Sequence, residues 1–181
     1  MGMIGIFVYV GAEVAIGTFL VNYAMENMNL SEAQAANLVA FYWGGAMVGR
    51  FIGIFSLKIW RPGIVLSLHA VLAAILLLIS ISTIGPVSVY SLILIGVCNS
   101  VMFPTIFTLA LKDLKSVEKA SGLLATAIIG GAIIPYFTGI LADSSGLKTA
   151  FILPGVCYIF IVVYGWSYWE TKTSSTFAEN V

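Results

Sequence analysis

MIGIFVYVGAEVAIGTFLVNYAM, residues 3–25, is the stretch that decides the fold of this chain. It holds a single charged side chain, Glu13, and about 20 apolar residues suffice for a helix to cross the roughly 30 Å hydrocarbon core of a bilayer. A carboxylate near the middle of such a helix costs roughly 3 kcal/mol on insertion scales, so it normally faces a cavity or a partner. We therefore expect a transmembrane helix with Glu13 as a candidate functional residue.

Composition extends this expectation to the whole chain. Apolar residues make up 60% and charged residues 9% of the 181 residues, and the mean hydropathy is +1.06, which excludes an ordinary soluble domain. The other long apolar stretches cover 35–57, 64–84, 87–111, 120–142 and 149–169. We predict an all-α membrane protein in which residues 1–170 form six transmembrane helices and 171–181 form a polar cytoplasmic tail.

The basic residues predict the orientation in the membrane. Seven of the eight Lys and Arg residues fall near the second and fourth connectors or after the last span, whereas only Lys148 falls on the other side. The seven are Arg50, Lys58, Arg61, Lys112, Lys115, Lys119 and Lys172. Cytoplasmic loops carry an excess of Lys and Arg, so we expect a multi-pass protein of the cell membrane with both termini in the cytoplasm. Six aromatic residues near the span ends fit interfacial belts: Tyr23, Trp60, Tyr90, Trp166, Tyr168 and Trp169.

Local signals predict how the helices begin and pack. Ser31, Pro62 and Pro86 are suited to helix starts. Small residues recur every four positions within three spans, which favours close helix packing. These rows are Gly45, Gly49 and Gly53; Gly96, Ser100, Pro104 and Thr108; and Ala127, Gly131, Pro135 and Gly139. Two of the rows contain an internal proline, which removes a helical hydrogen bond and loosens the turn before it, as suits a protein that rocks between two states.

Several classes of protein are excluded by what the spans contain. Cys98 and Cys157 lie in apolar surroundings without metal-ligand spacing, so we expect packing roles and no metal or cofactor. An intramembrane protease would need a serine partner for His69 or a second acid beside Glu13, and neither can be identified. We expect a structural hydrogen bond for His69, no enzyme activity and no nucleic-acid partner.

Four motifs then indicate a family. The runs YVGAEVAIGTFLVNY (9–23), GRFIG (49–53), FPTIF (103–107) and IGG (129–131) occur in order and span most of the chain. Together they resemble the carboxy-terminal half of the fucose/glucose/galactose:proton symporters of the major facilitator superfamily. The resemblance implies 3+3 inverted repeats, a substrate site near mid-membrane, a bacterial inner-membrane location and an amino-terminal six-helix half that this chain lacks.

The expected site centres on Glu13, with Tyr9 and Gly17 one helical turn to either side. A sugar needs polar acceptors for its hydroxyls and aromatic rings for its C–H faces, and no Lys or Arg within the spans is expected to pair with Glu13. The resemblance therefore implies proton-coupled monosaccharide transport by alternating access, with Glu13 as a sugar ligand more than as the coupling site. The alternative is a non-transporting six-helix scaffold or sensor derived from a transporter half.

The remaining candidates divide into two groups. Further substrate-binding candidates are Asn99, Phe103, Tyr42, Trp43, Asn37 and Thr126. Asn99 is assigned either a substrate contact or a helix–helix hydrogen bond, and the resemblance implies that related symporters carry a tyrosine at the position of Phe103. Gating or structural roles are expected for Arg50, Gly49, Gly53, Pro104, Gly131 and Pro135. For Arg50 the choice lies between a latch that holds neighbouring helices in one state and a positive-inside anchor at the cytoplasmic end of its helix.

Overall fold

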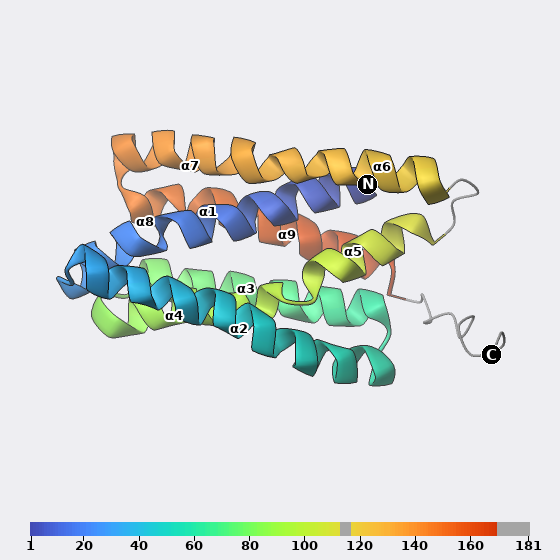
Figure 1. Ribbon diagram of the computed structural model, residues 1–181, viewed down its shortest axis with the longest axis horizontal. Helices are drawn as coiled ribbons and strands as arrows, with labels where there is room; N and C mark the ends of the chain where they lie inside the picture. The colour runs from blue at the N-terminus through green and yellow to red at the C-terminus, as the bar shows by residue number, and fades with distance from the viewer. Residues whose placement is uncertain (113–116, 170–181) are drawn as a thin grey trace.

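The computed structural model describes residues 1–112 and 117–169, whose secondary-structure elements are all helices joined by short turns. Six segments are long and apolar enough to cross a membrane, and they pack side by side into one bundle (Figure 1). They run over Gly2–Met28, Glu32–Ile59, Pro62–Ser82, Gly85–Leu111, Val117–Ser145 and Leu147–Ser167. The predicted all-α, six-helix membrane fold is confirmed, whereas the predicted tail lies outside the described residues.

Three spans are single helices and three are interrupted. The single helices are α1 (Gly2–Met28), α2 (Glu32–Ile59) and α3 (Pro62–Ser82). The interrupted spans consist of α4 (Gly85–Asn99) and α5 (Met102–Leu111); α6 (Val117–Thr126), the 3₁₀ turn η1 (Ala127–Ile129) and α7 (Gly130–Ser145); and α8 (Leu147–Ala150) and α9 (Ile152–Ser167). Helix starts follow the sequence signals: Ser31 and Gln34 form a capping box on α2, and Pro62 and Pro86 lie in the first turns of α3 and α4.

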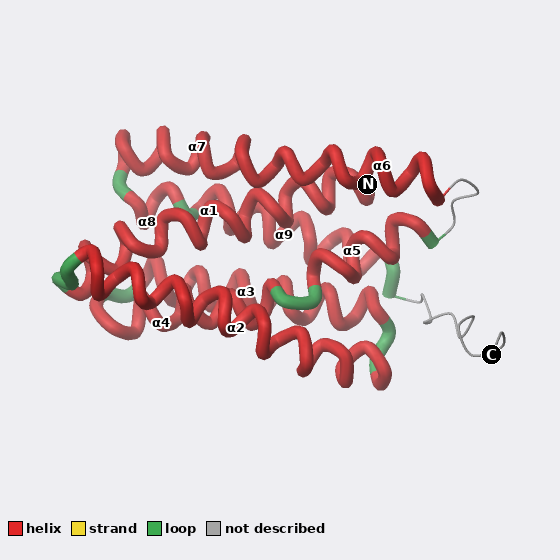
Figure 2. The backbone as a smooth tube through the Cα atoms, viewed as in Figure 1, coloured by secondary structure: helices red, strands yellow, loops and turns green. Residues whose placement is uncertain are grey.

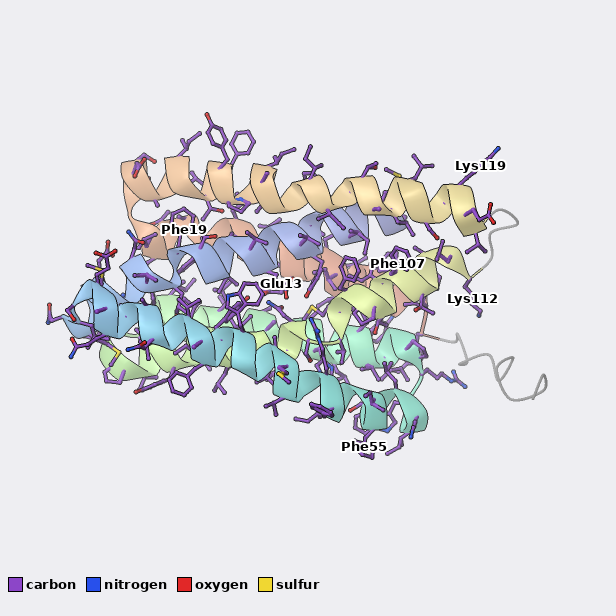
Figure 3. The ribbon with its side chains drawn as sticks, in the orientation of Figure 1. Glu13, Phe19, Phe55, Phe107, Lys112 and Lys119 are labelled. Atoms are coloured by element: carbon purple, nitrogen blue, oxygen red, sulfur yellow. The ribbon has the colours of Figure 1, made fainter. Side chains whose placement is uncertain are left out.

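Helix α1 is the central element, because it packs against α2, α4, α5, α7 and α9. Helix α3 packs mainly against α4 and α9. The chain enters α1 and leaves α9 at the same end of the bundle, which also holds the turn between α2 and α3 (Figure 1). Lys112 and Lys119 lie at that end, well away from Glu13 at mid-length (Figure 3).

The fourth span breaks just before its proline. Ser100 and Val101 separate α4 from α5 (Figure 2), because Pro104 has no N–H to donate to the Ser100 carbonyl one turn earlier. In the fifth span α7 instead continues through Pro135, and the departure from α-helix lies earlier, at η1. Gly130, the first residue of α7, crosses α1 so closely that a Cβ there would lie 2.0 Å from the Phe7 carbonyl oxygen.

Glycines bring α2 onto the broken span. A Cβ on Gly49 would lie 2.5 Å from the Ser100 hydroxyl oxygen, and one on Gly53 would lie 1.8 Å from a Val101 methyl carbon. From the other side, a Cβ on Gly96 would lie 2.2 Å from the Tyr42 carbonyl oxygen. Only residues without side chains permit this approach, so the glycine spacing sets where α2 meets the α4–α5 break.

One assignment to the interfacial belt is wrong. Tyr23 is fully buried, and its hydroxyl lies 2.6 Å from the Ser88 hydroxyl and donates to the Ser80 carbonyl at 2.8 Å. Its ring packs on Phe151 with the centroids 5.1 Å apart. A tyrosine whose hydroxyl finds partners inside the protein is stable in the core, although its position near a span end is typical of a membrane interface.

Candidate functional site

A cavity of about 450 Å³ lies between α1, α2 and the α4–α5 break. Its lining consists of Tyr9, Glu13, Arg50, Ser100, Phe103 and Pro104. It opens to the surface, because Arg50 and Pro104 are exposed and Glu13 and Phe103 are half-buried. The volume falls within the range typical of small-molecule pockets. Its aromatic wall is formed by Tyr9 and Phe103, whose ring centroids lie 6.2 Å apart at an interplanar angle of 54°.

The two charged residues of this cavity lie at similar depth in the bundle. Glu13 is 15 residues before the end of α1 and Arg50 is 18 residues after the start of α2, which corresponds to roughly 22 and 27 Å from the same connector. No ion pair within 4.0 Å joins them. Glu13 thus has no basic partner at ion-pair distance, as expected, but Arg50, a basic residue within the second span, lines the same cavity.

Helix packing explains why Arg50 lies at the cavity, although its position in the sequence suggested the cytoplasmic end of the helix. It lies nine residues before the end of α2, so a long side chain there could have reached toward the membrane surface. Its neighbour Gly49 instead lies against Ser100, a residue of the same cavity lining. Because α2 approaches the cavity at Gly49, the next residue, Arg50, lies at the cavity edge.

Behind the cavity wall lies a fully bonded polar cluster, which we call the asparagine hub: Tyr9, Tyr42, Asn99 and Tyr158. Asn99 is 0% exposed. Its amide nitrogen donates to the Tyr42 hydroxyl and its amide oxygen accepts from the Tyr158 hydroxyl, both at 2.9 Å. Tyr9 donates to the Asn99 carbonyl oxygen at 2.9 Å, at the end of α4. The structure thus favours the helix–helix alternative for Asn99.

The hub also holds Glu13 in place. The Tyr42 hydroxyl donates to the backbone carbonyl oxygen of Glu13 at 3.1 Å, and Tyr42 itself is fully buried, outside the cavity lining. Tyr9 belongs to both clusters, since it lines the cavity and donates to Asn99. Four helices, α1, α2, α4 and α9, therefore meet at one asparagine directly beside the cavity.

Besides Asn99 and Tyr42 of the hub, three further sequence candidates lie outside the lining of this cavity. Trp43 is 45% exposed and packs edge-on against Tyr42, with the centroids 5.2 Å apart. Asn37 is exposed near the start of α2. Thr126 donates to the Leu123 carbonyl oxygen of its own turn at 2.7 Å and borders a separate apolar cavity against α1. The structure does not bring these three residues to Glu13.

Sequence reasoning missed two participants, Ser100 and Tyr158, whereas the structural hydrogen bond expected for His69 is present. Ser100 was assigned only to a packing row, yet it lines the cavity, with its hydroxyl donating to the Val97 carbonyl oxygen at 2.7 Å. Tyr158 was not singled out, although a tyrosine in the middle of a span, away from the interfacial belts, signals a buried hydroxyl partner. His69 has a ring nitrogen 2.8 Å from the Val65 carbonyl oxygen of its own helix.

The fold and the cavity define a class: a multi-pass helical bundle of the kind found in secondary transporters, with a polar cavity at mid-depth beside a broken helix. Residues 2–180 match the Major Facilitator Superfamily. The chain belongs to that family.

Known relatives agree with this assignment. The chain is 50% identical over 168 residues to a glucose/galactose transporter of Brucella abortus, covering 91% of this chain and 41% of the relative. It is 33% identical over 174 residues to the L-fucose-proton symporter of Escherichia coli, covering 93% and 39%. The crystal structure of the transporter FucP in the outward conformation matches with a TM-score of 0.89 and 31% identity, covering 92% and 41%. These relatives are named as transporters and not as enzymes.

The chain spans about two fifths of the length of these relatives. The matched part is their carboxy-terminal half. The resemblance predicted from the four motifs is confirmed.

Proposed function

We propose that this chain forms the carboxy-terminal half of a monosaccharide:proton symporter and supplies one wall of its sugar cavity. The cavity lined by Glu13, Tyr9 and Phe103 is the observation that carries the proposal. A carboxylate accepts hydrogen bonds from sugar hydroxyls, and an aromatic wall packs against the C–H faces of the ring. The names of the relatives support a substrate of the glucose, galactose or fucose class.

Transport then proceeds by alternating access, in which the two halves rock around a site between them. The break at Ser100 and Val101 lies beside the cavity, where a change in helix direction would alter the wall. The partner is an amino-terminal six-helix half, and the assembly lies in a bacterial inner membrane with both termini of this chain in the cytoplasm. In this arrangement Glu13 is a sugar ligand more than the coupling site.

The test uses the amino-terminal half of the Brucella abortus glucose/galactose transporter, because that relative is 50% identical to this chain. Joined to that half, the chain should restore uptake of labelled glucose or galactose in cells that lack their own carriers. The chain alone should transport neither sugar. A chimaera that inserts into the membrane but takes up no hexose would refute the transporter assignment and favour a scaffold or sensor.

Glu13→Gln separates the two roles of the carboxylate in the same chimaera. A sugar ligand predicts a raised KM for the sugar while sugar-driven proton uptake persists. A coupling site predicts the opposite, namely sugar exchange without proton movement, and that result would reverse the assignment of Glu13.

A further inference from the structure

Arg50 stands out because the cavity otherwise lacks free hydrogen-bond donors. The hydroxyls of Tyr9 and Ser100 already donate to the carbonyl oxygens of Asn99 and Val97. The remaining lining residues, Glu13, Phe103 and Pro104, offer no donor when the carboxylate is ionised. Within residues 1–112 and 117–169, Arg50 is thus the one lining residue whose side-chain donors have no bonded partner.

A monosaccharide needs both kinds of partner, because each hydroxyl donates one hydrogen bond and accepts others. Glu13 supplies acceptors and Arg50 supplies a planar fork of five N–H donors. The two lie at similar depth on α1 and α2 and line one cavity without an ion pair between them. Neighbouring sugar hydroxyls can therefore bridge the carboxylate and the guanidinium.

The charges also fit a neutral ligand. An ionised residue within a span is normally balanced by an opposite charge. Arg50 and Glu13 provide this balance for each other, and the other groups that face Glu13 are the neutral phenols of Tyr9 and Tyr42. A simple positive-inside anchor would lie at the helix end, as Lys58 does on the last turn of the same helix.

We propose that Arg50 is a sugar-binding residue and the counter-charge of Glu13, holding sugar hydroxyls between its guanidinium and the carboxylate. The inference rests on the proposed function, since it assigns a further residue to the same sugar site. It also assigns specificity: the paired charges favour an uncharged monosaccharide over a sugar acid or an amino sugar.

The experiment measures hexose KM in the chimaera for Arg50→Gln, Glu13→Gln, the double variant and Lys58→Gln. Lys58→Gln is the matched control, because it removes an exposed cation from the same helix outside this cavity. Arg50→Gln should raise KM at least about tenfold, as expected for a lost charge-assisted hydrogen bond, whereas Lys58→Gln should change it less than about twofold. Because both residues bind one ligand in one cavity, the double variant should raise KM by clearly less than the product of the single effects.

An Arg50→Gln variant that matches Lys58→Gln, or single effects that simply multiply, would overturn the inference while leaving the transporter assignment intact. A wild-type chimaera that moves no hexose would overturn the proposed function instead. Should Arg50→Gln fail to reach the membrane, Arg50→Lys keeps the charge and loses the planar fork. A rise in KM of about fivefold or more for Arg50→Lys supports a guanidinium contact, and an unchanged KM contradicts it.

Discussion

The asparagine hub and the cavity share helices α1 and α2 and the residue Tyr9, yet their polar groups are in opposite situations. In the hub both amide atoms of Asn99 are bonded at 2.9 Å and the residue is 0% exposed. In the cavity the Glu13 carboxyl group and the Arg50 guanidinium group line the same wall but share no ion pair. Saturated buried groups fix the arrangement of helices, whereas charges left apart at the edge of a cavity are available to a ligand.

The largest effect is expected from breaking the hub. Asn99→Leu removes the acceptor of Tyr158 and the donor to Tyr42, leaving buried hydroxyls with lost partners, so the free energy of unfolding should fall by about 2 kcal/mol. Thermal unfolding of the purified chain in detergent measures this loss. Asn37→Leu is the control, because Asn37 is exposed and should cost less than about 0.5 kcal/mol. Equal losses would show that the hub does not stabilise the bundle.

The second-largest effect is expected from a substitution that pushes α2 away from the cavity. Gly49→Ala places a Cβ against the Ser100 hydroxyl and the Val97 carbonyl, both 2.5 Å away, so we expect a loss of about 1–2 kcal/mol in unfolding free energy and weaker sugar uptake as Arg50 moves. Gly44→Ala adds the same methyl group to the same helix with nothing within 4 Å. It should leave uptake unchanged and, through helix propensity, stabilise by up to about 1 kcal/mol. Matching behaviour of the two variants would contradict the role given to the α2 contact.

The membrane fold could be predicted from the sequence because lipid leaves few choices. Spans appear as long apolar runs, and helix starts are marked by residues such as Ser31 and Pro62 whose effect is local. Glu13 could be found for the same reason, since a charge inside a span is costly and therefore conspicuous. These inferences need no knowledge of how the helices pack.

The surroundings of Arg50 and Asn99, in contrast, could be assigned only from the way the helices pack. Whether Arg50 extends to the membrane surface or faces a cavity depends on how close Gly49 comes to Ser100, a contact between residues far apart in sequence. Whether Asn99 faces a ligand or other helices depends on the tyrosines of three other helices, which occupy its hydrogen-bonding groups. Spacing along one helix carries neither kind of information.

Two tyrosine variants distinguish the role of Tyr9 in the cavity from its role in the asparagine hub. Tyr9→Phe and Tyr158→Phe each remove one hydroxyl that donates to Asn99 at 2.9 Å, so each should lower the unfolding free energy by about 1 kcal/mol. Only Tyr9 lines the cavity, so only Tyr9→Phe should raise the sugar KM, by roughly three- to tenfold. A similar rise for Tyr158→Phe would mean that the hub acts on sugar binding as a unit.

The smallest effect is expected from adding a group to the cavity. Phe103→Tyr adds a hydroxyl group to the cavity wall, and because Phe103 lines the cavity one new hydrogen bond should lower the sugar KM by about two- to fivefold. Phe107 is the matched control, since its ring stacks on Phe103 with the centroids 6.0 Å apart and lies outside the lining. Phe107→Tyr should leave KM unchanged. If both hydroxyls lowered KM equally, the sugar would have to extend further along α5 than the cavity does, and if neither did, Phe103 would contribute its ring alone.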